Sequence, residues 1–385
     1  MRKRCLFGIF SIIIALFCIF IPQSINVIAF AKNEKCELTS AKGMCVMEAS
    51  SNRVLYEKDS SLKLPMASTT KIITAITVIE KVQNLDEICT IPFSAQGVSG
   101  SSIYLKANEH MSYRELLYGL MLKSGNDAAV ALAILTYDNI ENFAKHANLL
   151  CAKIGAKNTN MVTPNGLHDD KHYTTAYDLS LISSYALKNK TFAEIVSTKD
   201  KIISNELKVN KNDKRHLKNN NKLLKKYEGC DGVKTGYTLR AGRCYVGSAT
   251  KNGMQIVCTL LNCNPMFEEC EKLFDMAFEE YKIYNILEAH NHLGSYGVIN
   301  SDTKSVNVLS KEAFSYPLKR EELANVEIRN NLPADIRAPF KSNQEVGCTE
   351  IYLSKHLIFS TNIYTMEGVD SNSYLDYLSR ILQRM

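Results

Sequence analysis

Hydrophobic positions along the chain predict strands and helices in a definite order. Two apolar runs within residues 44–56, separated by the turn-forming residues 50–53, predict a β-hairpin. Helical spacing of apolar residues follows over 68–82, 113–122, 127–135, 140–154 and 177–187. Strands are expected over 232–234, 243–249 and 254–261, and a long amphipathic helix over 266–287. The order predicts an α/β (α+β) domain with an antiparallel sheet packed against helices.

From about residue 290 the pattern changes to short alternating runs. These runs, at 305–309, 326–329 and 350–353, are broken by Pro333, Pro339 and Gly347. Alternation interrupted by turn residues is typical of short strands. A small, all-β second domain is therefore expected.

The last residues of the chain form an amphipathic pattern of helical period. At about 100° per residue, apolar and polar side chains occupy opposite arcs. The apolar arc holds Tyr374, Leu375, Leu378, Ile381, Leu382 and Met385, and the polar arc holds Asp376, Ser379, Arg380, Gln383 and Arg384. Such a helix is too short to span a bilayer. It can lie in the membrane interface or dock on its own protein, and the pattern does not choose between these.

The first 31 residues have the pattern of a secretory signal peptide. A basic start, Arg2-Lys3-Arg4, precedes an apolar block over 5–21 and the small-x-small sequence Ala29-Phe30-Ala31. The alternative is an uncleaved membrane anchor, because the apolar block approaches spanning length. Both interpretations predict an exported protein that works outside the cytoplasm. We expect a signal peptide at 1–31, a first domain at 32–289, a β-rich domain at 290–367 and a tail helix at 368–385.

Charge and cysteine usage narrow the possibilities further. The net charge is +6, and much of it lies in the run 208–226, which predicts a solvated loop or hairpin or a surface that attracts an anionic wall polymer or lipid. The run lacks the interleaved aromatic residues that stack on bases, so nucleic acid is not an expected partner. The chain has 12 cysteines. Those after the signal segment are scattered without a Cys-x-x-Cys motif, which favours reduced thiols over a disulfide framework.

Ser68 and Lys71 form the first candidate catalytic pair. At helical spacing of three, the hydroxyl and the amine share one face and can form a hydrogen bond. A lysine in an apolar site beside other cations has a lowered pKa, and its neutral amine can take the serine proton. The first turn of the helix also leaves backbone N–H groups for developing negative charge. On its own, however, Ser-x-x-Lys more often marks a helix N-cap with a lysine reaching to solvent.

Two further motifs change that weighing. Ser124-Gly125-Asn126 falls between two predicted helices, and Lys234-Thr235-Gly236 ends a predicted strand. These motifs add four groups to the Ser68–Lys71 pair: a serine, an amide, a second lysine, and a glycine that permits close approach of a backbone. Ser-x-x-Lys, Ser-x-Asn and Lys-Thr-Gly in this order are the signature of penicillin-binding proteins and class A β-lactamases.

The chain resembles the low-molecular-mass penicillin-binding proteins that are serine-type D-alanyl-D-alanine carboxypeptidases. The stretches KLPMASTTKIITA, LMLKSGNDAAVALA, TPNGLHDDKHYTTAYDLSLIS, CDGVKTGYTLRAGRCYVGSA and YPLKREELANVEI carry the resemblance, which covers about residues 36–367. It implies a β-lactamase/DD-peptidase-like catalytic domain without a cofactor. The implied partners are peptidoglycan stem peptides ending in D-Ala-D-Ala and β-lactams, which would acylate the same serine.

The resemblance also implies a role for each motif residue. Ser68 would be the nucleophile and Lys71 its base, while Ser124 would pass a proton to the leaving amine. Substrate would be held by Asn126, Lys234, Thr235, Gly236 and Tyr237, with Arg243 as a further contact. The backbone N–H groups of Ser68 and Tyr237 would form the oxyanion hole.

The residues also suggest three alternative interpretations: a β-lactamase, a β-lactam sensor or wall-binding protein, and a metal site. A class A β-lactamase needs a glutamate that activates water, and Glu194 lies in an apparent helix. A non-hydrolytic β-lactam sensor or wall-binding protein would acylate and stop. The cluster His168-Asp169-Asp170-x-His172 has spacing that could hold a metal, but the resemblance makes it a structural loop, and no metal is expected.

Overall fold

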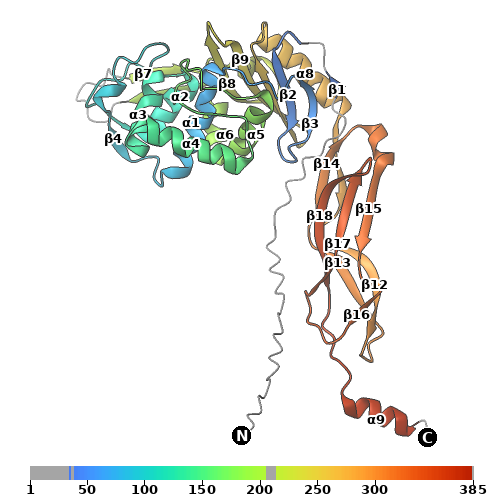
Figure 1. Cartoon of the computed structure of the whole chain (residues 1–385). Helices are drawn as coiled ribbons and strands as arrows, with labels where there is room; N and C mark the ends of the chain where they lie inside the picture. The colour runs from blue at the N-terminus through green and yellow to red at the C-terminus, as the bar shows by residue number, and fades with distance from the viewer. Residues whose placement is uncertain (1–33, 36–38, 205–213, 384–385) are drawn as a thin grey trace, which may run out of the picture.

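A six-stranded sheet forms the centre of the larger unit, with helices on both of its faces (Figure 1). The structure is a computed structural model that describes residues 34–35, 39–204 and 214–383. In spatial order the strands are β1 Glu34–Lys35, β3 Val54–Lys58, β2 Gly43–Glu48, β10 Met254–Leu261, β9 Gly242–Lys251 and β8 Cys230–Thr238. Neighbours are antiparallel except β1 and β3, which are parallel. The predicted hairpin at 44–56 and the predicted strands 232–261 are confirmed.

Side chains of β2 alternate between two separate hydrophobic cores. Cys45 and Met47 pack in the core beneath the main helical layer, and Met44 and Val46 pack in the core beneath α8 Met266–Glu280. Successive side chains of a strand point to opposite faces, so helices on both faces require an unbroken apolar run. This is why GMCVME is buried along its whole length.

The main helical layer follows the predicted helices closely. Its members are α1 Lys71–Lys81, α2 Tyr113–Leu122, α3 Asn126–Tyr137, α4 Ile140–Ile154, α5 Ala176–Leu187 and α6 Lys190–Ser197. Helices α2, α4, α5 and α6 start where a capping side chain satisfies free backbone N–H groups. Ser112 and Glu115 form a capping box on α2, and Thr175 caps α5. The five predicted helices are confirmed, with α1 preceded by the short 3-10 helix η1 Ala67–Thr70.

The helix predicted over 266–287 is wrong in its last third. Helix α8 ends at Glu280, and residues 282–287 form strand β11 Lys282–Leu287, which pairs with β14 Phe314–Leu318. Ile283, Tyr284 and Ile286 favour a strand once a distant partner is available, and this partner is not visible in a local pattern. The pairing joins residues on both sides of the expected boundary at 289.

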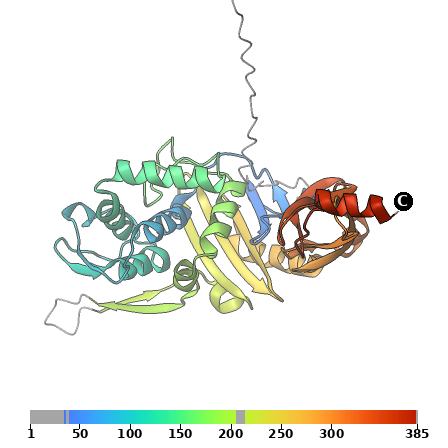
Figure 2. The ribbon, with the colours of Figure 1, turned by 90° about the horizontal axis from the view of Figure 1, so that it is seen from below.

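Two short antiparallel pairs of strands flank the helical layer. One pairs β4 Ile88–Thr90 with β5 His110–Ser112, and the other pairs β6 Asp200–Ser204 with β7 Lys214–Lys218. The second projects from the edge of the molecule (Figure 2). The described part of the basic run, residues 214–226, therefore includes one arm of a hairpin and the short helix α7 Leu223–Lys226, while residues 208–213 lie outside the described residues.

The smaller unit is β-rich, as predicted. Its six-stranded sheet has the order β15 Val326–Asn331, β17 Glu345–Leu353, β18 His356–Thr365, β13 Ser305–Ser310, β12 Asn291–Ile299 and β16 Asp335–Arg337. Helix α9 Tyr374–Gln383 follows at the end of this unit farthest from the larger unit (Figure 1). Among the described residues, no helix combines the length and the hydrophobicity needed to cross a bilayer.

Arg53, in the turn between β2 and β3, connects the two units. Its guanidinium donates to the carbonyl of Pro317 and forms an ion pair with Glu322 at 2.5 Å. It also lies over the rings of Tyr281 and Tyr316, each 5.3 Å from the ring centroid. A buried arginine with this many partners makes the contact between the units specific in orientation.

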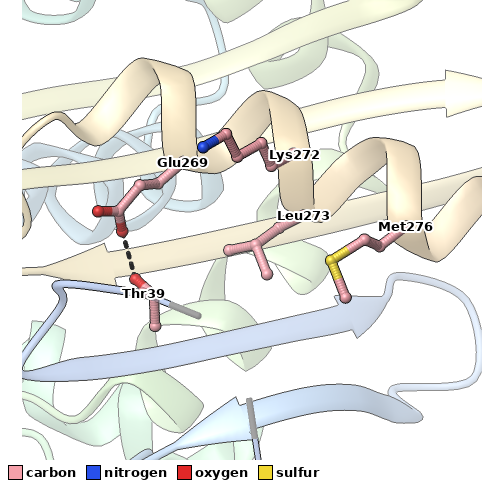
Figure 3. A pocket seen from close by; sticks show the side chains of 5 residues that line it. All are labelled: Thr39, Glu269, Lys272, Leu273 and Met276. Atoms are coloured by element: carbon pink, nitrogen blue, oxygen red, sulfur yellow. Dashed lines mark hydrogen bonds between the residues drawn. The ribbon is translucent and has the colours of Figure 1, made fainter. Parts of the chain in front are cut away.

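The residues just before β2 are held against α8. The Thr39 hydroxyl donates to the Glu269 carboxylate, and both groups line a small pocket with Lys272, Leu273 and Met276 (Figure 3). None of the candidate catalytic residues lies in this pocket.

The cysteines whose thiols the structure describes form no disulfide bond. They are Cys45, Cys89, Cys151, Cys230, Cys244, Cys258, Cys263, Cys270 and Cys348.

Candidate active site

Ser68 lies in the 3-10 turn that leads into α1, and Lys71 is the first residue of α1. The turn begins at Ala67, whose φ of 47° is uncommon for a residue with a side chain. Gly166 packs against it so closely that a Cβ there would lie 2.0 Å from the Ala67 carbonyl oxygen. The sharp turn therefore depends on a loop about a hundred residues further along the chain.

Lys71 is fully buried, and its amine has three oxygen neighbours. Lys71 Nζ lies 3.0 Å from Ser68 Oγ, 2.6 Å from Asn126 Oδ1 and 2.7 Å from the backbone carbonyl oxygen of Asn165. Asn126 Nδ2 donates to the carbonyl of Ser99 at 2.6 Å, which fixes the amide so that its oxygen faces Lys71. The predicted serine–lysine pair is thus in contact.

Burial is the main cause that lowers the pKa of Lys71 well below its ordinary value. The nearby charge of Lys234 lowers it further, and the carboxylate of Asp127 opposes the shift. Burial also lowers the pKa of Lys234 to about 7. Removing an ammonium group from water disfavours its charged form. The buried position of Lys71 beside a second cation therefore favours its neutral amine over the ammonium form.

Ser124 stands between α2 and α3 with a φ of 61°, a left-handed conformation that is strained for serine. The side chain is buried, and Ser124 Oγ has no hydrogen-bond partner among the described residues. A buried, unpartnered hydroxyl is rare in proteins. Its neighbour Asn126 begins α3, and the Asn126 N–H donates to the Ser101 carbonyl at 2.7 Å.

Strand β8 forms the opposite side of the cluster. Lys234 is buried, and its amine donates to the Thr235 carbonyl at 2.9 Å. A Cβ on Gly236 would lie 2.9 Å from the backbone nitrogen of Ser68. Only glycine lets the strand pass this close to the nucleophile's backbone. The three motifs therefore meet where η1, the start of α3 and the end of β8 come together.

The two remaining predicted residues are exposed. The Tyr237 side chain is 59% exposed, and the guanidinium of Arg243 lies over its ring at 5.7 Å from the centroid. Arg243 and Tyr237 are also cross-strand neighbours of β9 and β8. Both lie on the outer surface next to Gly236 and can contact a ligand there.

The cluster 168–172 does not gather as a metal site. Among the described residues, no group of three or more His, Cys, Asp or Glu side chains could hold a metal ion. His168 pairs with exposed Asp170 at 3.2 Å, while His172 is buried and contacts Thr70 and the backbone of Val162. The two histidines have different surroundings.

Glu194, the glutamate weighed for a β-lactamase, is bound elsewhere. Glu194 lies on helix α6, and its carboxylate accepts a hydrogen bond from the Tyr118 hydroxyl at 2.9 Å. None of its hydrogen bonds involves Ser68 or Lys71. The structure thus gives no support to Glu194 as an activator of deacylating water.

Several groups next to the pair were not identified from the sequence. The carbonyl of Asn165 is an acceptor for Lys71, and the carbonyls of Ser99 and Ser101 hold Asn126. Backbone carbonyls leave no signal in residue type. The glycine after Asn165 was the available hint, because a glycine next to polar residues marks a loop that can approach another backbone closely.

Comparison with known proteins agrees with the geometry. Residues 30–264 match the sequence profile of a family described as D-alanyl-D-alanine carboxypeptidase. Residues 281–371 match a profile described as the C-terminal domain of penicillin-binding protein 5.

Individual relatives cover nearly the whole chain. The chain is 29% identical to D-alanyl-D-alanine carboxypeptidase DacF of Bacillus subtilis over 367 residues, which is 92% of this chain and 93% of the relative. It is 29% identical to DacC of Escherichia coli over 362 residues, covering 90% of this chain and 89% of DacC. The crystal structure of penicillin-binding protein 5 from Haemophilus influenzae superposes with a TM-score of 0.73 at 27% identity, covering 86% of this chain and 98% of that one. This chain belongs to the family of serine-type D-alanyl-D-alanine carboxypeptidases.

Proposed function

We propose that Ser68 is the nucleophile of this carboxypeptidase and that Lys71 is its general base. The observation that carries the proposal is the set of three oxygen atoms around Lys71 Nζ. A neutral amine has two N–H bonds and one lone pair, and the oxygens of Asn126 and Asn165 can only accept. Both N–H bonds are then directed to these oxygens, and the lone pair faces the Ser68 hydroxyl at 3.0 Å.

Ser124 is proposed to carry the proton to the leaving group. Its hydroxyl is buried without a partner among the described residues, so a substrate nitrogen could occupy its hydrogen-bonding position. Asn126 would hold the substrate amide while its oxygen orients Lys71. Asn126 would therefore couple substrate binding to the direction of the Lys71 Nζ lone pair.

Lys234 and Thr235 are proposed to bind the terminal carboxylate of D-Ala-D-Ala. A cation at the end of β8 favours an anionic group and also lowers the pKa of Lys71. The backbone N–H groups of Ser68 and Tyr237 would stabilise the oxyanion, because Gly236 brings the strand next to Ser68. Arg243, exposed beside Tyr237, is proposed as a further carboxylate contact.

The proposed reaction has two steps. Ser68 Oγ attacks the carbonyl between the two D-alanines, its proton passes to Lys71, and the terminal D-alanine leaves after protonation through Ser124. Water then hydrolyses the acyl-enzyme and releases the shortened stem peptide. A β-lactam acylates the same serine, but its leaving group stays attached to the acyl chain, so hydrolysis is obstructed.

Covalent labelling tests this assignment. Intact-protein mass spectrometry after mixing with a penicillin should show one adduct on the wild type and none on Ser68→Ala. A pentapeptide ending in D-Ala-D-Ala should release D-alanine with the wild type only. Labelling of the Ser68→Ala variant would contradict the proposal. Rapid turnover of penicillin would instead favour a β-lactamase, and acylation without D-alanine release would favour a sensor.

The proposed place of action is the outer face of the cytoplasmic membrane or the cell wall. In α9, the apolar side chains Tyr374, Leu375, Ile381 and Leu382 are each at least 60% exposed. An apolar helix face that its own protein does not cover favours insertion into the membrane interface over docking on the same chain. The predicted signal segment 1–31, which lies outside the described residues, would supply export.

Membrane attachment can be tested by vesicle flotation. The chain with Leu378→Asp and Ile381→Asp should remain with the soluble fraction, whereas the wild type should float with anionic phospholipid vesicles. Penicillin labelling should be unchanged in both. Flotation of the double variant would show that α9 is not the attachment site.

A further inference from the structure

His172 lies beneath the turn that carries the proposed nucleophile. It is 4% exposed and belongs to the loop that also supplies Asn165 and Gly166. Its two ring nitrogens have different partners: Nε2 lies 2.8 Å from Thr70 Oγ1, and Nδ1 lies 3.0 Å from the backbone nitrogen of Val162. The ring therefore connects the loop to η1.

The hydrogen bonds identify one tautomer from both ends. The Val162 N–H can only donate, so Nδ1 must accept. The single hydrogen of the Thr70 hydroxyl is donated to the Ala67 carbonyl at 2.7 Å, so Thr70 Oγ1 accepts from the ring. Both requirements give a neutral imidazole with its proton on Nε2. Burial lowers the pKa of His172 to about 4, in keeping with this form.

The chain of hydrogen bonds ends at the residue before Ser68. Ala67 is held in a strained conformation with φ 47°, and its carbonyl accepts from Thr70. The donated Nε2–H keeps the Thr70 hydroxyl pointed at Ala67. Without it, the hydroxyl is free to rotate, and the strained turn loses a constraint one residue from the nucleophile.

We propose that His172 is a positioning residue that acts through Thr70 to hold the Ala67–Ser68 turn in the geometry needed for acylation. This proposal rests on the assignment of Ser68 as the nucleophile. The hydrogen bonds of His172 go to Thr70, Val162 and Thr163 and not to Ser68 or Lys71, so its effect is on the placement of Ser68 Oγ against Lys71. Small displacements of a nucleophile have large effects on rate.

Two conservative substitutions separate the two ends of the ring. In His172→Gln the side-chain amide N–H can replace Nε2–H and still donate to Thr70. In His172→Asn the shorter amide oxygen can replace Nδ1 and still accept from Val162, but nothing reaches Thr70. Both variants remove one hydrogen bond of a buried residue, so their melting temperatures are expected to fall by similar amounts.

The measurement is the acylation rate constant with a fluorescent penicillin, per titrated active site of the full chain. We expect His172→Asn to acylate roughly 10- to 100-fold more slowly than the wild type and His172→Gln to stay within about threefold. His168→Gln, at the exposed histidine of the same cluster, is the matched control and should acylate at the wild-type rate. Equal rates for His172→Asn and His172→Gln would overturn the proposal.

Thr70 provides a second comparison, and its two single variants leave His172 unchanged. Thr70→Ser keeps the hydroxyl and should acylate nearly as the wild type does, whereas Thr70→Val should be slow. Adding His172→Asn to Thr70→Val should cause no further loss, and losses that multiply would contradict action through Thr70. If the wild type labels only at Ser68 while these rates stay unchanged, the His172 proposal alone fails. Label that persists on Ser68→Ala would instead remove the proposed function.

Discussion

Lys71 and Lys234 are two buried lysines of one cluster, and the charge of Lys234 lowers the pKa of Lys71. The proposed roles of the two amines need opposite protonation states, since a general base must be neutral and a carboxylate-binding group must be charged. Burial acts on both, but Lys71 carries the additional repulsion from its neighbour. The arrangement predicts a pH window in which Lys71 is neutral and Lys234 still charged.

Asn126→Asp should move the acidic side of that window. A carboxylate in place of an amide oxygen 2.6 Å from Lys71 Nζ stabilises the ammonium form and raises the pKa of Lys71. The acidic limb of the acylation profile should therefore shift to higher pH, with a rate at pH 7 reduced roughly 10- to 100-fold. Stopped-flow acylation from pH 5 to pH 9 measures this. An acidic limb that stays in place or moves to lower pH would argue against Lys71 as the base.

Lys234→Arg should remove the fall in activity on the basic side of the pH profile. In the wild type, kcat/KM for a D-Ala-D-Ala peptide should fall as pH rises through about 7, because Lys234 loses its proton and the carboxylate its partner. Arginine stays protonated, so the falling limb should disappear from this range. The same peptide with a C-terminal amide is the control and should show no such limb in the wild type. A limb near pH 7 that persists with the amide would assign it to another group.

Gly236→Ala tests the close approach of β8 to the nucleophile. The added methyl carbon would lie 2.9 Å from Ser68 N and 3.2 Å from the Ala67 side chain, so the strand or the turn must shift. Acylation should fall by about 100-fold or more, because both the nucleophile and the proposed oxyanion donor are displaced. The rate of penicillin labelling gives the answer. Gly253→Ala, at a hairpin tip with open space around it, controls for the loss of a glycine and should leave labelling unchanged.

Arg53→Ala should loosen the contact between the two units. The substitution removes an ion pair, a hydrogen bond and two ring contacts, and leaves Glu322 with the Lys319 backbone N–H but without its ion-pair partner. Removal of one partner of a buried ion pair costs about 3 to 5 kcal/mol, and the partial exposure of Glu322 lowers that figure here. A lower melting temperature and a broader distance distribution in small-angle scattering are expected. Arg329→Ala, which removes an exposed ion pair with Glu327, should change neither.

Stability should also fall in acid because of His172. Its pKa is about 4 in the folded chain against an ordinary value of 6.5, so the unfolded chain binds the extra proton first. The neutral imidazole therefore contributes stability that is full above pH 6.5 and is lost as pH falls toward 4, by roughly 3 kcal/mol in total. The fall in melting temperature between pH 7 and pH 4 should be smaller in His172→Gln. Parallel curves for the two proteins would show that other groups cause the acid sensitivity.

Sequence patterns predicted most of the scaffold, because the period of a buried face is a local property. Helices 113–122 and 140–154 and the strand 254–261 coincide with their predicted bounds. The failure at residues 282–287 has a physical cause. A strand there depends on hydrogen bonds to β14, about thirty residues away, and short apolar runs do not distinguish the two states.

The sequence by itself determined which functional groups exist and how they are spaced: a hydroxyl and an amine one helical turn apart, a serine with an asparagine, and a lysine with a glycine. Only the tertiary structure decided that these groups meet, that Lys71 has two further acceptor oxygens, and that buried His172 is hydrogen-bonded to Thr70 in the turn before α1. The reason is that spacing along the chain specifies neighbours within one helix or strand. Burial, the direction of a lone pair and the lowered pKa of a lysine arise from residues about 55 to 165 positions apart, which only the packed chain brings together.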